Sequence, residues 1–259
     1  QEYGVKVSVA QKRKNLDKFG RNLAVGTSFE TVAEFQGTTA NETFVTTNTV
    51  FSISSSSASD TMDVTVEGHT IDLTGRLTFA TQTVTLTGQT PVTLGTPLAR
   101  ANRIFINSSG TFGTTPPGAV GTVYVYDITG GQTGGVPTIP AATKLILGIG
   151  DTQGNKCATA FDNSTYWFIS TLSVGIGNSG GSANRVTFQM QRRFIPSGGP
   201  WRPLGREVVV PIGQLASQLK FTPYIIVPRN NDFRVVAKTN SNTAEVFANA
   251  SGYLASVIG

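Results

Sequence analysis

The chain has 259 residues, of which 39% are hydrophobic and only 14% are charged, with a formal net charge of +5. This length allows one large β domain or two small ones, and the low charge leaves Thr, Ser, Asn, Gln and Gly to cover most of the surface. No run of eighteen apolar residues and no apolar leader segment occurs, so neither a transmembrane helix nor a secretory signal is expected. Cys157 is the only cysteine, which excludes an intrachain disulfide, and we expect it to be a small buried apolar residue.

Residues 1–40 are predicted to form an extended, basic N-terminal arm. They show no sustained alternation of apolar and polar residues and no helical apolar stripe. An arm that cannot bury its own apolar groups must lay them on its own body, a symmetry mate or a partner. We expect the arm to bind a partner through basic residues that meet an acidic surface and phenylalanines that fill pockets: Lys12, Arg13, Lys14, Lys18, Phe19, Arg21 and Phe29.

From about residue 42 the sequence alternates with period two, as in "MDVTVEG" and "TVYVYDI", and Gly, Pro and Asn clusters interrupt it. This pattern predicts about a dozen short antiparallel strands and an all-β fold, a β-sandwich or jelly-roll body of one or two sandwiches. "VEGHTIDL" is interpreted as a hairpin, and only "PIGQLASQLK" (211–220) resembles a helical turn. Composition suggests a Thr/Ser-rich β region at 41–118 and a larger sandwich region at 119–259, although 41–259 can equally be one domain.

Charge is distributed unevenly along the chain. Residues 41–96 are net acidic, whereas residues 178–206 contain five arginines and no acid. Such separated charges allow docking on other copies of the chain or on an oppositely charged scaffold, and solvated strand ends are the alternative. The arginines of this possible inter-subunit basic face are Arg185, Arg192, Arg193, Arg202 and Arg206.

The sequence offers no catalytic constellation. His69 is the only histidine, and Asp63 and Glu67 alternate on one strand instead of converging across a cleft as a glycosidase pair would. Motifs for nucleophilic, metal-dependent or phosphate-binding chemistry are absent. We therefore expect a non-enzymatic protein without cofactor or metal. Nucleic acid is a less favoured partner than protein, because Phe188 and Met190 share the parity of a core-facing strand instead of forming an exposed stacking surface.

Several phrases together resemble one known family. "DKFGRNLAVGTSFETV" resembles the N-terminal arm of a family of virion structural proteins from tailed double-stranded DNA bacteriophages, especially marine and podovirus-like ones. "DVTVEGHTIDLTGRLTFATQTVTLTGQTPVTL", "ANRIFINSSG", "YWFISTLSVGIG" and "NNDFRVVAKTNSNTAEVFANASGYL" are similar to later phrases of that family, in the same order. The resemblance covers residues 17–254.

The resemblance implies a protein of the virion that assembles in the host cytoplasm. We expect a head decoration, or cement, protein that binds the major capsid protein on the outer shell, most simply as a homotrimer. A tail or portal-vertex component, such as a tail-fibre adaptor, is the alternative. A carbohydrate-binding module or depolymerase would instead need clustered exposed Trp and Tyr residues or a carboxylate pair, and Trp167 and Trp201 stand in unlike contexts.

Overall fold

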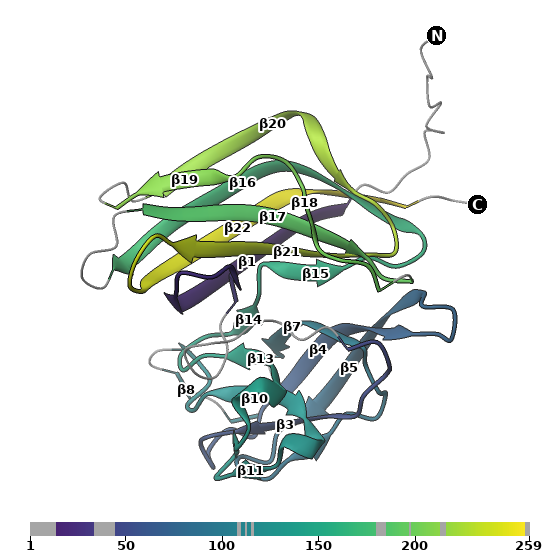
Figure 1. The fold of residues 1–259 in the computed structure, drawn as a ribbon. Helices are drawn as coiled ribbons and strands as arrows, with labels where there is room; N and C mark the ends of the chain where they lie inside the picture. Colours follow the sequence, from purple (N-terminus) through teal and green to yellow (C-terminus); the bar gives the residue numbers. More distant parts are fainter. Residues whose placement is uncertain are drawn as a thin grey trace.

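The computed structural model describes residues 14–33, 45–107, 110–111, 113–114, 117–179, 185–196, 198–212 and 216–256. Across these residues the fold is all-β, because helical structure is confined to two 3-10 turns, η1 (Ile128–Gly130) and η2 (Pro140–Ala142). This confirms the predicted all-β sandwich class. The antiparallel sheets pair into two sandwiches, which lie one above the other in Figure 1.

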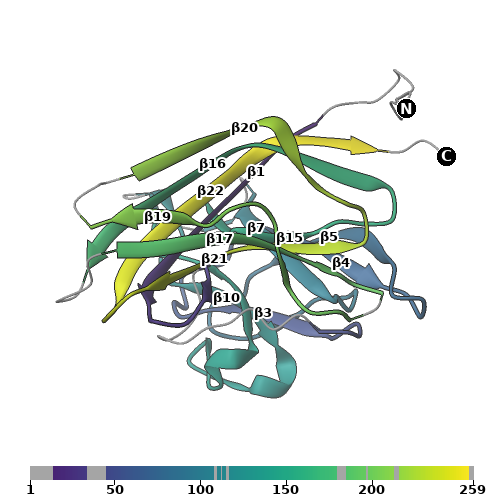
Figure 2. The same ribbon diagram turned by 45° about the horizontal axis from the view of Figure 1, so that its top comes forward.

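The upper sandwich, here called the major sandwich, consists of sheets I and II. Sheet I has the strand order β1 (Lys14–Val25), β22 (Ala244–Ser256), β16 (Thr165–Ser179), β20 (Ala216–Val227). Sheet II has the order β15 (Ala158–Ala160), β21 (Asn231–Thr239), β17 (Arg185–Phe194), β18 (Arg202–Pro203), with β19 (Val208–Pro211) on β17 and β2 (Glu30–Thr31) on β21. Inward side chains of both sheets, with Trp167, Phe188 and Phe233 among the largest, form one core. Figure 2 shows the long strands of sheet I from a second angle.

The lower sandwich, here called the inserted sandwich, consists of sheets III and IV. Sheet III has the order β13 (Thr143–Leu147), β10 (Val123–Asp127), β3 (Phe51–Ser55), β6 (Val92–Thr93). Sheet IV has the order β14 (Gln153–Asn155), β7 (Arg100–Ile106), β4 (Asp63–Ile71), β5 (Leu77–Thr85). Two short pairs lie beside them, β8 (Gly113–Thr114) with β9 (Pro117–Gly118) and β11 (Gln132–Thr133) with β12 (Val136–Pro137). Inward side chains of sheets III and IV, such as Ile53 of β3 and Val66 of β4, fill a separate core.

The boundary between the sandwiches differs from the expected one at residue 118. Strands β3 to β7, β10 and β13 share the inserted core, so Pro117 and Gly118 lie within that sandwich. The chain leaves the major sandwich after β2 and returns to it at β15. The inserted sandwich therefore interrupts the major one. Composition missed this because the Thr/Ser-rich strands and the later aromatic strands β10 and β13 pack on the same core.

Residues 14–33 are not a separate arm but part of the major sandwich. β1 pairs along its length with β22, from Lys14 opposite Leu254 to Val25 opposite Ala244. Val25 and Val32 are fully buried in the core, and a Cβ added at Gly20 would collide with the Val32 carbonyl oxygen. The expectation of an extended N-terminal arm is thus wrong for these residues, because backbone pairing and burial hold them in the sheet. Residues 1–13 lie outside the described part of the chain.

Two local interpretations also need correction. β4 and β5 are joined at Asp72–Arg76, where the Asp72 carboxylate accepts hydrogen bonds from the backbone N–H groups of Thr74 and Arg76, which closes the turn. His69 therefore lies inside strand β4 and is buried, instead of occupying a solvated hairpin turn. Residues 216–220 belong to strand β20, so the helix-like reading of 211–220 is wrong there.

Candidate functional site: a junction network and two exposed surfaces

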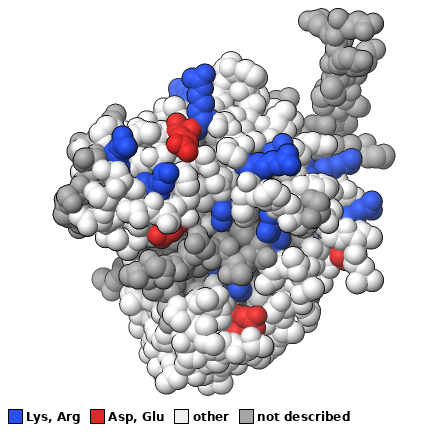
Figure 3. Space-filling model, in the orientation of Figure 1, with Lys and Arg blue, Asp and Glu red and all other residues white. Residues whose placement is uncertain are grey.

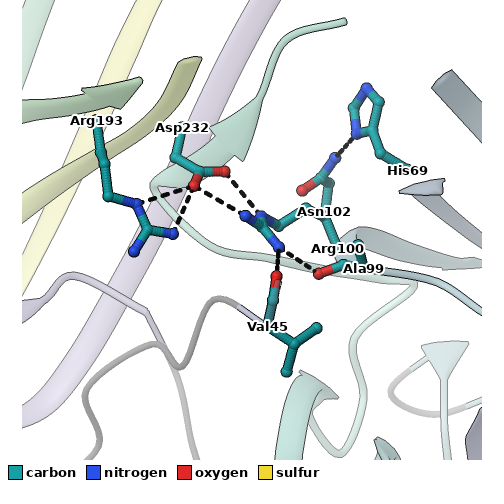
Figure 4. Close-up of polar contacts among 7 residues, drawn as sticks. All are labelled: Val45, His69, Ala99, Arg100, Asn102, Arg193 and Asp232. Carbon is teal, nitrogen blue, oxygen red and sulfur yellow. Dashed lines mark hydrogen bonds and ion pairs between the residues drawn. The ribbon is translucent and has the colours of Figure 1, made fainter. Parts of the chain in front are cut away.

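A buried ion network joins the two sandwiches. Arg100 on β7 donates to Asp232 on β21 through Nε to Oδ1 at 2.7 Å and Nη2 to Oδ2 at 2.9 Å. Arg193 on β17 donates through Nη2 to the same Oδ2 at 2.8 Å, so two guanidinium groups share one carboxylate (Figure 4). The side chains of Arg100 and Asp232 are 2% and 0% exposed. Removing one partner of such a buried pair leaves an uncompensated charge, and the network links β7 of the inserted sandwich to β17 and β21 of the major sandwich.

A bulge in β7 aims this part of the chain at the junction. Glu67 of β4 lies opposite Arg103, but the next residue, Gly68, lies opposite Ala101, so Asn102 is the extra residue. Only glycine fits at position 68, because a Cβ there would collide with the carbonyl oxygen of Arg100. Nη1 of Arg100 donates to the carbonyl oxygens of Ala99 and Val45 (Figure 4).

Asn102 connects two further buried side chains, Lys18 and His69. The backbone carbonyl oxygen of Asn102 accepts a hydrogen bond from Lys18 Nζ at 3.5 Å, and the side-chain Nδ2 of Asn102 lies 2.8 Å from Nδ1 of His69. Because an amide nitrogen can only donate, the proton of neutral His69 belongs on Nε2. Burial lowers the pKa of His69 to about 4. Burial, reinforced by the charge of Lys156, lowers the pKa of Lys18 to about 8. We call Lys18, His69, Arg100, Asn102, Arg193 and Asp232 the junction network.

The carboxylates considered as a catalytic pair in the sequence, Asp63 and Glu67, do not belong to the junction network. Asp63 accepts a hydrogen bond from Thr85 at 2.5 Å, and Glu67 faces Arg103 at 3.5 Å. These two carboxylates stand four residues apart on one strand, roughly 13 Å by strand rise, and Asp72 is used in the turn. Within the described residues no group of three or more His, Cys, Asp and Glu side chains is placed to hold a metal ion. None of the described helical segments is long and apolar enough to span a membrane.

The predicted arm residues are distributed over different environments. Lys12 and Arg13 lie outside the described residues, and Lys14 is exposed at the start of β1. Lys18 points into the junction, whereas Phe19 lies on the outer face of sheet I and is about half exposed. Arg21 is partly exposed on that same face, and the ring of Phe29 lies 4.3 Å below Lys238 Nζ. The structure therefore does not bring the five described residues of this set together on one surface.

The predicted basic face is divided by the strand register. Arg185 begins β17 opposite Pro211, while Arg192 lies near the other end opposite Arg202 of β18. Arg193 is engaged with Asp232, and Arg206 is exposed beyond β18. On the face shown in Figure 3, Lys and Arg side chains gather mainly over the major sandwich, and the inserted sandwich below is mostly uncharged. Arg192 and Arg202 thus form the one directly opposed pair among the five predicted arginines.

The outer face of sheet I carries apolar side chains at two places. At one end Phe168 stacks on Tyr253 with ring centroids 4.9 Å apart, Tyr224 meets Tyr253 edge-on at 5.3 Å, and Ile226 lies opposite Phe168. At the other place Phe19 and Leu23 project from β1. Phe19, Leu23, Tyr224 and Ile226 are 46 to 54% exposed. A polar row separates the two apolar areas: Ser251, Thr171 and Lys220. We call this surface the sheet I face.

Sequence reasoning missed both the junction network and the aromatic end of the sheet I face. The partners Arg100 and Asp232 are 132 positions apart, and no local pattern connects them. The signal for the aromatic end is present in "YWF" and "PYII", where Phe168 and Ile226 have the parity opposite to the buried Trp167 and Val227. If the two strands had been recognised as neighbours, their outward-facing apolar side chains would have been placed side by side.

Comparison with known proteins gives only weak likenesses. No protein family and no curated protein sequence matches the chain. Among solved structures, the chain is similar to one from the T13 IBDV viral particle at 9% identity and TM-score 0.26, over 95% of this chain and 70% of that one. It is also similar to one from the Gx strain of infectious bursal disease virus at 7% identity and TM-score 0.20, over 95% of this chain and 76% of that one. A tandem CBM22-1–CBM22-2 domain of Paenibacillus barcinonensis Xyn10C aligns at 13% identity and TM-score 0.24, over 97% and 100% of the two chains. Scores this low carry no argument for a shared function.

Proposed function

We propose that this chain is a non-enzymatic structural protein of a bacteriophage virion, and that it decorates the outer shell of the head. In this role it binds the major capsid protein, as a homotrimer, and adds interface area that resists internal pressure. The proposal starts from the ordered phrases that resemble virion structural proteins over residues 17–254. It also agrees with a surface that is poor in charge, which suits a protein packed against neighbours.

The observation that carries the proposal is the sheet I face. Half-exposed Phe19 and Leu23 on β1 and Tyr224 and Ile226 on β20 lie on the outer side of one sheet. Exposed apolar areas with polar surroundings mark protein–protein contact sites. Large apolar side chains that fill pockets of a partner typically dominate such an interface. The rigid strands β22 and β16 between the two apolar areas hold them at a fixed spacing, as a two-point contact requires.

The test uses the full chain and capsids purified without it. We expect the Phe19→Ser and Ile226→Ser variants to bind these capsids at least tenfold more weakly, because each removes an apolar anchor from the sheet I face. The matched control is Leu73→Ser, which removes an equally apolar side chain from the fully exposed β4–β5 turn of the inserted sandwich. Binding is measured by co-sedimentation at increasing protein concentration.

Two results would overturn the proposal. One is equal binding by the wild type and both sheet I variants, with all of them folded by circular dichroism. The other is the absence of this chain from purified particles. The tail alternative is separated by copy number: a decoration protein is present at numbers comparable to the major capsid protein, whereas a vertex component is present in the few copies that one vertex allows. Mass photometry of the isolated protein tests the trimer.

Carbohydrate binding is a second candidate, favoured by the aromatic end of the sheet I face alone. Tyr224 is exposed beside the stacked Phe168 and Tyr253, and a cleft of about 310 Å³ next to it is lined by Ser170, Thr171, Lys220 and Thr222 among others. Flat rings beside hydrogen-bonding groups suit a sugar ring, whose C–H face packs on aromatics. Affinity electrophoresis in polysaccharide gels would support this candidate if wild-type migration is retarded and Tyr224→Ala migration is not. Unretarded wild-type migration in every gel would remove it.

A further inference from the structure

The end of sheet II holds two arginines in direct opposition. β17 and β18 are antiparallel, and their register places Arg192 opposite Arg202. Side chains directly opposite each other in such a pair have Cβ atoms about 4.5–5.5 Å apart and project to the same side. Like charges in this arrangement repel one another and destabilise the strand pair. Two arginines at these opposed positions therefore need an anion to balance their charge.

No anion within the described part of the chain does so. Arg193 is bound to Asp232 and Arg234 donates to Gln191 at 2.9 Å, but the guanidinium groups of Arg192 and Arg202 form neither a hydrogen bond nor an ion pair with any described residue. Arg202 is exposed and Arg192 is partly exposed. Both guanidinium groups are accordingly available to a ligand from outside the molecule.

The two arginines line a pocket of about 260 Å³ together with Phe194, Gly199, Pro200 and Asn231. Its volume lies just below the range of small-molecule sites, which begins at about 300 Å³, so it suits one or two side chains better than a cofactor. Arg192 and Arg202 supply donors for a carboxylate. Phe194, which is half exposed, and Pro200 supply an apolar wall. The combined chemistry fits an acidic residue next to an apolar one.

The surroundings favour a peptide over a nucleic acid. Binding a strand of nucleic acid needs several free cations along a track and open aromatic faces for base stacking. Trp201 next to the pocket lies between Arg234, at 4.1 Å from its ring centre, and Arg193, at 5.1 Å, so that its ring is already engaged by cations of the same chain. Arg193 is further committed to the junction network. The two remaining arginines match one carboxylate cluster and not a phosphate track.

We propose that the Arg192–Arg202 pocket is a binding site for the carboxylate of an acidic, apolar-flanked segment of another protein chain. The site lies on sheet II, away from the sheet I face, and it does not depend on a role in a virion. Ligand binding there replaces the repulsion between the arginines with two charge-assisted contacts. The pocket therefore gains stability when it is occupied.

The test uses the full chain and a fluorescein-labelled peptide that contains Leu-Glu-Glu-Leu, with the matched Leu-Gln-Gln-Leu peptide as ligand control. Fluorescence anisotropy should show binding of the Glu peptide at least tenfold tighter than the Gln peptide, and weaker binding at high salt. Arg192→Gln and Arg202→Gln should each lower the affinity at least tenfold. Arg185→Gln, at the opposite end of β17, should leave it unchanged.

A thermal melt separates binding from a merely structural role. Arg202→Gln should melt at the wild-type temperature or above it without peptide, because one of two like charges is gone, and should lose the upward shift that the Glu peptide gives the wild type. The proposal is overturned if neither peptide binds at millimolar concentration, if both bind equally, or if Arg185→Gln weakens binding as much as Arg202→Gln. Equal protection by inorganic phosphate would indicate a general anion site, and tighter arginine-dependent binding of a labelled oligothymidylate would indicate a nucleic-acid site. Either outcome would refute the peptide assignment.

Discussion

Replacing Asp232 with alanine tests whether the junction network couples the two sandwiches. The change removes the carboxylate that pairs with Arg100, whose side chain is 2% exposed, while its hydrogen bonds to the carbonyl oxygens of Ala99 and Val45 remain. Breaking a buried pair from one side costs about 3–5 kcal/mol. Arg193 adds little to this figure, because its side chain is 17% exposed and can turn to water. The expected loss is a large share of the roughly 5–15 kcal/mol that stabilises a typical domain.

Urea unfolding followed by two probes measures this loss. Both tryptophans belong to the major sandwich, so their fluorescence reports that sandwich, while circular dichroism reports both. We expect Asp232→Ala to lower the free energy of unfolding and to separate the two transitions. Glu67→Ala is the control, because it breaks the partly exposed pair with Arg103 and should cost less than about 1 kcal/mol. The double variant Arg100→Met, Asp232→Leu should recover much of the loss, because it removes the buried charge of Arg100 together with its partner and leaves Arg193 free to turn to water. A loss below about 1 kcal/mol for Asp232→Ala would refute the reasoning.

Three further predictions concern buried residues of the major sandwich and the junction. Gly20→Ala should lower the melting temperature clearly, because the new Cβ would collide with the Val32 carbonyl, and an unchanged melting temperature would show that β1 is not packed as described. The free energy of unfolding should fall by up to about 3 kcal/mol as pH drops from 6.5 to about 4, because the unfolded chain binds the His69 proton in this window and the folded chain does not. His69→Gln should lack this part of the pH dependence. Identical pH profiles of the wild type and the variant in urea unfolding would contradict the prediction. Cys157 is fully buried and burial raises its pKa to about 12, so the folded protein should resist thiol reagents at pH 8 that label the unfolded chain at once.

The sequence predicted strands best where the buried face is apolar. The alternation in "TVYVYDI" marks β10, and its inward Val123 and Val125 are fully buried. The alternation pattern did not reveal β1, because its polar or small residues Lys18, Gly20 and Asn22 face inward while Phe19 and Leu23 face outward. Its stability comes from backbone pairing with β22 and from glycine's close approach, neither of which alternates in hydropathy. A strand with inverted polarity therefore looks like an arm.

The candidate surfaces were predictable only in part. The arginine-rich stretch directed attention to residues 185–206, but only the register of β17 with β18 brings Arg192 and Arg202 together and places Arg185 at the far end. The segment "VEGHTIDL" was interpreted as a hairpin, although Gly68 within it lies in β4 opposite the bulge that directs Arg100 and Asn102 into the junction. Tertiary pairing between strands distant in sequence decides such features, and single-sequence patterns contain no information on it.

The insertion of one sandwich into the other has a consequence for synthesis on the ribosome. The inserted sandwich spans an unbroken stretch of chain, so its core can form as soon as β14 has emerged. β1 precedes the other described strands but pairs with β22, the last of them, so its edge stays open until β22 has been made. Contacts between such distant segments form slowly, and unpaired strand edges invite aggregation. Until β22 has been made, β1 is thus an unpaired edge that can aggregate, and chaperone binding near β1 is a place to look for limits on yield.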